Sequence, residues 1–223
     1  MESEPLAVEV VQFVATEQCI ADPSLFRAVR DFVAHDRKEK GLTAQYWGAS
    51  VERPKEFYWI LLWQTRAHAA AFEEDPSYPA FAQRRQALAT APVLVVLVHL
   101  SGNPLRCLEA PVTEVDVYRA QAAVAETTQD KIHRLTYRIE SLQVPGFIAL
   151  SWGVALEDVS RGAFIAGWRA VEDHLRLGML EDHNVFRQET EEIFDTLEEL
   201  FATHVCFKPH EATEDLSLGE ASG

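Results

Sequence analysis

Short apolar runs and helical patterns alternate along the first hundred residues. Apolar and β-branched residues that alternate or run continuously predict strands at 8–15, 43–50, 57–63 and 92–100. Apolar positions at helical spacing predict helices at 23–40, 66–74 and 78–90. Asp22 followed by Pro23 is typical of a helix start, and Gly41 is typical of a helix end. The predicted order is strand, helix, strand, strand, helix, helix, strand.

The second half of the chain repeats this order. Strands are predicted at 114–119, 147–154, 162–168 and 201–207. Helices are predicted from a cap at Thr127 or Thr128 to Leu142, and over 172–180 and 183–197. Pro145-Gly146 stands where Gly41 ends the corresponding helix of the first half.

A constant shift relates the two halves. Gly41 to Gly48 (GLTAQYWG) matches Gly146 to Gly153 (GFIALSWG), and 146 − 41 = 105. The same shift pairs Trp63 with Trp168, His99 with His204, and Glu9-Val10 with Glu114-Val115. Tryptophan is rare, so two tryptophan pairs on one ungapped shift indicate a duplication of one domain-sized unit.

The duplication predicts the domain organisation and the fold class. The first repeat is expected over 1–100, a linker over 101–111, the second repeat over 112–209 and a disordered acidic tail over 210–223. A βαββαβ unit carries its helices on one sheet face, so its bare apolar face requires a second sheet. We therefore expect an α+β protein of two ferredoxin-like repeats whose antiparallel sheets pack face to face.

Composition excludes several classes of function. The formal net charge is −15, and such an acidic surface repels phosphate backbones, so no nucleic acid partner is expected. The three cysteines are scattered, which indicates no disulfide framework and no metal site. The acidic start Met1-Glu-Ser-Glu-Pro is unlike a signal peptide, and the longest apolar run is too short to span a bilayer. A cytoplasmic protein without membrane contact is expected.

Two motifs carry a resemblance to a known family. They are Trp63-Gln-Thr-Arg-Ala-His68 and Trp168-Arg-Ala-Val-Glu-Asp-His174, in which a tryptophan closes the third strand and a histidine begins the next helix. In these motifs the chain resembles the dimeric α/β-barrel superfamily, in particular its antibiotic-biosynthesis monooxygenase-like branch. The resemblance covers the whole chain, once per repeat, and implies an intramolecular pseudo-dimer, either monomeric or assembled further into a homodimer.

The resemblance also implies where a ligand binds and which chemistry to expect. In such proteins a small-molecule pocket lies between the sheet and its own helices. The family includes cofactor-free monooxygenases, polyketide cyclases and haem proteins. Haem-degrading members carry a ligating histidine where this chain has Glu73 and Glu74, or Gly178 and Met179, so no haem or other cofactor is expected.

Histidines are the candidate catalytic residues. His174 is the strongest, because the adjacent Glu172 and Asp173 are expected to raise its pKa and prepare it for proton abstraction. His183 at the start of the last helix is a candidate accessory group, and His68 is the first-repeat candidate. The matched His99 and His204 are interpreted as strand-end residues bonded to neighbouring backbone.

Aromatic residues on the strands are candidate pocket walls for a flat, hydrophobic ligand. The predicted substrate-binding residues are Trp152, Trp168, Phe164, Met179, Trp47, Trp63 and Tyr46. The third strand is bulky in the first repeat (FYWILLW) and small in the second (GAFIAGW), which favours a pocket in the second repeat. The helices that follow show the opposite difference in side-chain size, smaller in the first repeat and larger in the second, as expected where a strand and its helix together fill a constant volume.

These residues lead to a functional hypothesis with two alternatives. The hypothesis is a cofactor-independent enzyme that abstracts a proton from an aromatic or polyketide-like molecule, leading to cyclisation, dehydration or aromatisation. The first alternative is a cofactor-free monooxygenase of the same fold. The second is a non-catalytic small-molecule-binding or stress-response protein.

Overall fold

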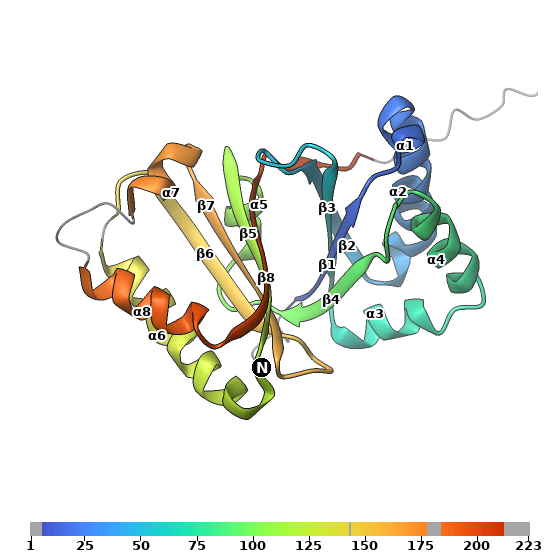
Figure 1. The fold of residues 1–223 in the computed structure, drawn as a ribbon. Helices are drawn as coiled ribbons and strands as arrows, with labels where there is room; N and C mark the ends of the chain where they lie inside the picture. The colour runs from blue at the N-terminus through green and yellow to red at the C-terminus, as the bar shows by residue number, and fades with distance from the viewer. Residues whose placement is uncertain (1–5, 143, 178–183, 212–223) are drawn as a thin grey trace, which may run out of the picture.

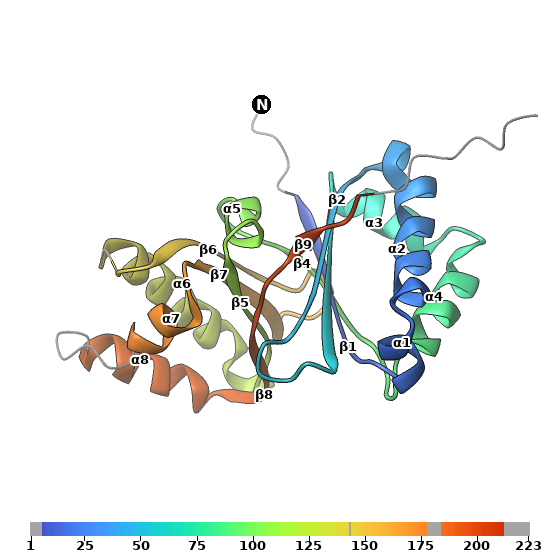
Figure 2. The same ribbon diagram turned by 90° about the horizontal axis from the view of Figure 1, so that it is seen from above.

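The computed structural model describes residues 6–142, 144–177 and 184–211. Two antiparallel sheets lie face to face in the middle of the molecule, and each carries its helices on its outer side (Figure 1). The view from above shows the same layering, with α1 to α4 on one side and α6 to α8 on the other (Figure 2). The predicted α+β pseudo-dimer is confirmed.

The first repeat forms the five-stranded sheet, in the order β4-β1-β3-β2-β9. Its elements are β1 (Ala7–Val14), α1 (Glu17–Ala21), α2 (Pro23–Arg37), the 3₁₀ turn η1 (Lys38–Lys40), β2 (Leu42–Ala49), β3 (Glu56–Trp63), α3 (Arg66–Glu73), α4 (Tyr78–Ala87) and β4 (Leu94–His99). The short helix α1 is an addition to the predicted order. It is capped by the Thr16 side chain, which accepts from the Cys19 N–H.

The second repeat forms the four-stranded sheet, in the order β6-β7-β5-β8. Its elements are β5 (Val112–Ala120), η2 (Ala122–Val124), α6 (Ala125–Ser141), β6 (Phe147–Val154), β7 (Arg161–Trp168), α7 (Val171–Leu177), α8 (Asn184–Phe194), β8 (Leu197–Val205) and β9 (Lys208–Pro209). The predicted cap of α6 is wrong. The helix begins after Val124, and the Thr128 hydroxyl lies inside it and donates to the Val124 carbonyl.

Strand register confirms the shift of 105. Glu9 pairs with Leu61 between β1 and β3, and Glu114 pairs with Ala166 between β5 and β7, as the shift requires. A register irregularity falls between Leu42 and Ala44 in β2 and between Phe147 and Ala149 in β6, again 105 apart. The repeats therefore share their pairing as well as their sequence pattern.

Three hydrophobic clusters fill the layers. The cluster between the sheets includes Val10 and Ile60 from the first repeat and Val115 and Ile165 from the second, so each sheet supplies the face that the other lacks. The other two clusters lie between each sheet and its own helices, around Trp63 in the first repeat and Trp168 in the second.

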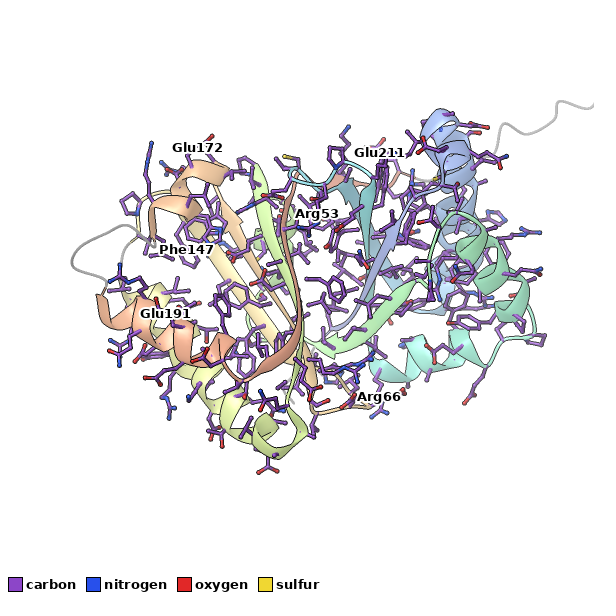
Figure 3. The ribbon with its side chains drawn as sticks, in the orientation of Figure 1. Arg53, Arg66, Phe147, Glu172, Glu191 and Glu211 are labelled. Carbon is purple, nitrogen blue, oxygen red and sulfur yellow. The ribbon has the colours of Figure 1, made fainter. Side chains whose placement is uncertain are left out.

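Contacts at the sheet edges hold the repeats together. Isolated bridges join Val98 of β4 to Ala155, and Ser50 to Val205 of β8. Arg66 at the start of α3 lies 3.8 Å from Glu157, which follows β6 (Figure 3). The interface between the repeats is therefore closed along both edges.

The chain segments outside the repeats are more structured than predicted. The linker over 101–111 contains helix α5 (Pro104–Leu108), whose Cys107 and Leu108 are buried in the core between the sheets. The short strand β9 at the end of the second repeat pairs with β2 of the first. His210, assigned to the tail by the sequence, donates its backbone N–H to the Gln45 carbonyl, while residues 212–223 lie outside the described part.

Two glycines occupy matched positions that exclude other residues. Gly41 and Gly146 have φ angles of 97° and 82°, in the left-handed region that favours glycine. A side chain at Gly41 would also overlap the His68 ring, and one at Gly146 would overlap the Asp173 carboxyl group. Gly41 ends its helix as predicted, whereas α6 ends at Ser141, before Gly146 is reached.

Candidate functional site

A buried carboxylate lies beneath the helices in each repeat. Glu9 on β1 accepts a hydrogen bond from the Trp63 indole N–H at 3.2 Å, and Glu114 on β5 accepts one from Trp168 at 3.1 Å. The strands place both carboxylates on the sheet face that the helices cover. The repeats differ in what surrounds this shared pair.

In the first repeat the space above Glu9 is filled. Arg85 of α4 lies 3.4 Å from the Glu9 carboxylate, and both side chains are almost completely buried. Phe72 lies between Trp63 and Phe81, with ring centres 5.5 and 5.0 Å apart. Trp63 is fully buried in this cluster, so it forms no pocket wall.

In the second repeat smaller or polar residues stand at the matched positions. Leu177 replaces Phe72, Thr190 replaces Arg85, and His174 replaces Ala69, each 105 residues further along. A pocket of about 300 Å³ opens here between the sheet and its helices. Its apolar lining residues are Leu135, Ile139, Phe164, Trp168, Leu177 and Phe194, and its polar ones are Glu114, His174, Arg187, Thr190 and Glu191.

His174 lies at the sheet side of this pocket. Its ring stacks on Trp168 with centres 5.0 Å apart, and its Nε2 is 3.3 Å from Oε1 of Glu114. Its Nδ1 is 2.7 Å from Nε2 of His204 on β8. The histidine that the sequence singles out thus contacts a second histidine and a carboxyl group.

A two-residue register shift brings His204 to this place. In the first repeat His99 pairs with Ala7 at the end of β4, so the shift of 105 would pair His204 with Val112. His204 pairs instead with Glu114. An even shift keeps His204 on the helix-covered face, beside His174. His204 lies at the end of β8 as expected, but its ring contacts the side chains of His174 and Glu52 and not the neighbouring backbone.

The first repeat supplies the outer member of this arrangement. Glu52, which follows β2, accepts from the His204 ring through Oε1 at 2.5 Å, and from the His204 backbone N–H and the Thr203 hydroxyl through Oε2. Burial acts to raise the pKa of Glu52, but these hydrogen bonds outweigh it and lower the pKa to about 2. Glu52 is thus a carboxylate at neutral pH. We call Glu52, His204 and His174 the histidine relay.

The pKa of His174 moves opposite to the sequence prediction. Burial of the ring, together with repulsion from His204, lowers its pKa to about 4 despite the opposing effect of Glu52. The flanking acids do not reverse this. Glu172 is exposed at the outer end of α7 (Figure 3), and Asp173 pairs with Arg176. His174 is therefore a neutral imidazole at physiological pH.

The two carboxyl groups beside the histidine relay, those of Glu114 and Asp116, have raised pKa values. Burial and the neighbouring Asp116 raise the pKa of Glu114 well above its usual range. Burial also raises the pKa of Asp116, to about 7. Two carboxyl groups that face the same side of β5 cannot both ionise easily, so this pair holds a proton more readily than an isolated carboxyl group. The pocket therefore combines a neutral base with a weakened carboxylic acid.

The structure brings some of the other predicted second-repeat residues to this pocket. Trp168 and Phe164 line the pocket with His174. Trp152 lies under α6 on a different side, with its ring 5.7 Å from that of His133 and no contact with the pocket. His183 and Met179 lie outside the described residues, so nothing tests their predicted roles.

The predicted first-repeat residues do not form a matching site. His68 bonds through Nδ1 to the Thr65 hydroxyl at 2.9 Å, and Tyr46 lies between the sheets with its hydroxyl 3.2 Å from Glu109. Trp47 lines a separate cavity on the outer side of the first sheet. The structure does not bring Tyr46 and Trp47 to one site, because successive strand residues face opposite sides of the sheet.

Two further features of the described residues are relevant. No helix among them is long and apolar enough to cross a membrane. Within the same residues, no group of three or more His, Cys, Asp or Glu side chains is arranged to hold a metal ion.

Comparison with known proteins rests on structure, because no protein-family model and no curated protein sequence matches the chain. The chain is similar to an anthrone oxidase-like protein, with a TM-score of 0.68, 11% identity and 97% of each chain covered. It is also similar to a "putative monooxygenase" from Fusobacterium nucleatum (TM-score 0.64, 9% identity, 95% of this chain and 96% of that one). A protein of the same description from Lactobacillus acidophilus gives a TM-score of 0.58 at 12% identity, with 94% and 97% covered.

This chain has the tandem dimeric α/β-barrel fold. The resemblance to antibiotic-biosynthesis monooxygenase-like proteins that the two tryptophan motifs predict is confirmed at the level of the fold. At these identities the likeness concerns the fold, and the chemistry has to be argued from the second-repeat pocket.

Proposed function

We propose that this protein is a cofactor-free oxygenase that removes a proton from an activated carbon of a flat aromatic substrate and passes the carbanion to dioxygen. The observation that carries the proposal is the neutral His174 in an apolar pocket, held by the histidine relay. The names of the full-length structural neighbours, monooxygenase and anthrone oxidase-like, support oxygenation over cyclisation.

The relay sets the tautomer of His174. Glu52 is ionised and can only accept, so the His204 proton on that side lies on Nδ1. With its proton on Nδ1, His204 has a lone pair on Nε2, which accepts from Nδ1–H of His174. His174 is left with a lone pair on Nε2, the atom that faces Glu114 and the pocket. A general base requires this lone pair.

Glu114 supplies the complementary group. Its raised pKa favours the protonated carboxyl group, which can donate a hydrogen bond to a substrate carbonyl oxygen as that oxygen becomes negative. Its Oε1 lies 3.3 Å from His174 Nε2, so both groups can reach one substrate. The aromatic and aliphatic walls suit a flat body, and about 300 Å³ lies at the lower end of ligand-pocket volumes.

The proposed reaction balances with dioxygen as oxidant. His174 takes one proton from a CH₂ group conjugated with an aromatic ketone, the carbanion adds dioxygen to give a peroxide anion, and the proton on His174 converts this anion to a hydroperoxide. Loss of water from the hydroperoxide leaves a second carbonyl group, with one dioxygen consumed and one water formed per substrate. In this step His174 takes the remaining proton of that carbon as the O–O bond breaks, and passes it to the departing hydroxide to give the water.

Oxygen uptake with anthrone as the probe tests this function. We expect the protein to consume one dioxygen per anthrone converted to anthraquinone, and to do nothing when oxygen is removed. Turnover that continues at the same rate without oxygen would instead support the cyclisation or dehydration hypothesis. Binding of anthrone with no conversion above the uncatalysed rate would support the non-catalytic alternative.

Glu52 is predicted to act as a positioning residue. Glu52→Gln removes the negative charge that fixes the tautomer of His204, and we expect kcat to fall about tenfold, as for loss of one supporting hydrogen bond. Because Glu52 raises the pKa of His174, the substitution should lower that pKa further. Imidazole nitrogen shifts in an NMR titration measure this directly. An unchanged His174 titration would exclude a relay from Glu52.

A further inference from the structure

A second cavity, of about 500 Å³, lies in the first repeat. It is bounded by α1, α2 and the outer face of the first sheet, so the sheets separate it from the second-repeat pocket (Figure 2). Its wall is mostly apolar, with Ile20, Pro23, Phe26, Trp47, Pro54 and Phe57, and it also includes Cys19, Ser24, the half-exposed Arg27 and Arg30. Phe26 meets both Trp47 and Phe57 edge to face, with ring centres 5.9 Å apart. We call it the first-repeat cavity.

One buried cation interrupts this apolar wall. Arg30 of α2 lines the first-repeat cavity and is only 4% exposed. Its guanidinium carbon lies 4.1 Å from the ring centres of both Phe26 and Trp47, so the aromatic rings cover its faces and leave its edge. At that edge Nε donates to Nδ1 of His210, whereas Nη1 is buried and has no hydrogen-bond partner among the residues that the structure describes.

The neighbouring groups leave the charge of Arg30 incompletely compensated. Burial lowers the pKa of Arg30 to about 10, which still leaves it protonated at neutral pH. The adjacent carboxylate, Asp31, already lies 3.0 Å from Nε2 of His210 and 3.6 Å from Nε of Arg27. A buried cation without a hydrogen-bonded anion is costly, so this edge of Arg30 favours a bound anion.

We propose that the first-repeat cavity binds an apolar monocarboxylate, with its aromatic or aliphatic body against Phe26, Trp47 and Phe57 and its carboxylate on the free edge of Arg30. A guanidinium edge matches a carboxylate, and the hydrogen bond gains strength away from water. The C-terminal segment takes part, because β9 pairs with Trp47 and carries His210 to Arg30. The site is independent of the second-repeat pocket and of its proposed chemistry.

Calorimetric titration with a matched pair of probes tests the proposal. Naphthoate and naphthylmethanol have the same aromatic body, and only naphthoate carries the charge. We expect one naphthoate to bind per chain, at least tenfold more tightly than the alcohol, since a hydrogen bond to a charged group contributes about 1.5 to 3 kcal/mol. Equal affinities for acid and alcohol would overturn the proposal.

Two variants locate the bound acid. Arg30→Gln should weaken naphthoate at least tenfold and leave naphthylmethanol within about twofold, whereas the control Arg84→Gln, exposed on α4 and outside the cavity lining, should change either by less than about threefold. Ile20→Trp should abolish binding of both probes by filling the cavity. If Arg30→Gln does not fold, the comparison of naphthoate with naphthylmethanol and the Ile20→Trp variant test the proposal instead. Naphthoate binding that survives Ile20→Trp would contradict the assigned site.

Discussion

Replacing His174 by glutamine is expected to lower kcat for anthrone oxidation by about 10² to 10³-fold, the range for loss of a general base. Glutamine keeps hydrogen-bonding capacity near His204 and Glu114, so the pocket should remain formed. It offers no basic nitrogen, and the substrate proton then has no acceptor of suitable strength. Initial rates of oxygen uptake measure the loss, and near-ultraviolet circular dichroism checks that the variant folds.

The control is the histidine of the first repeat. His68 lies in α3, much as His174 lies in α7. Its ring bonds to the Thr65 hydroxyl and does not line the pocket that contains His174, so His68→Gln should leave kcat within about twofold.

The pH profile adds a second readout. With the pKa of His174 lowered to about 4, kcat/KM of the native protein should remain on its plateau through pH 6.5 and fall only as the pH approaches 4. A His174→Gln variant that turns over at the native rate would show that the base lies elsewhere.

Replacing Arg85 by methionine is expected to lower the free energy of unfolding by about 3 kcal/mol at pH 8, because it leaves the Glu9 carboxylate buried without its cation. Burial already raises the pKa of Glu9, and Arg85 opposes that rise. In the variant the folded-state pKa is therefore higher still than the unfolded one. A raised folded-state pKa means that stability is lost as the pH increases, so the deficit should shrink as the pH falls towards 4.5.

Urea unfolding at pH 8 and pH 5 measures this effect. The control Arg84→Met changes the exposed neighbour on α4 and should alter stability by less than about 0.5 kcal/mol. The double variant Glu9→Gln with Arg85→Met should regain most of the loss, because the amide oxygen can still accept from Trp63. An Arg85→Met deficit that is the same at both pH values would mean that lost packing, and not the buried charge, is responsible.

The difference between the repeats explains why the second has a pocket beside its tryptophan–glutamate pair and the first does not. Both retain the tryptophan–glutamate pair, but the first neutralises its glutamate with Arg85 and fills the space with Phe72 and Phe81. The second has Thr190 and Leu177 at the positions of Arg85 and Phe72, which leaves its carboxyl group without a cation from this position and the space beside it open. A duplicated fold can thus fill this position in one half and leave it open to a ligand in the other.

Much of this architecture is determined by local sequence. The shift of 105 predicts two repeats, and Gly41 and Gly146 specify matched backbone conformations that other residues adopt only with strain. Period-two and helical patterns place nearly all the strands and helices, because each pattern reflects which face of an element is buried. The Trp168 motif also identifies His174, because that histidine lies in the first turns after the third strand.

Other features were decided only by the tertiary structure. His204 reaches His174 through a two-residue slip of β8, and an ungapped comparison cannot detect a slip that preserves the facing of every side chain. Glu52 comes from the other repeat, 152 residues away from His204 in the chain. The pKa of His174 depends on burial and on His204 more than on its sequence neighbours, because in a helix adjacent residues point to different sides. Pattern along the chain determines which face of an element is buried, whereas the partners across that face depend on register and on contacts between the repeats.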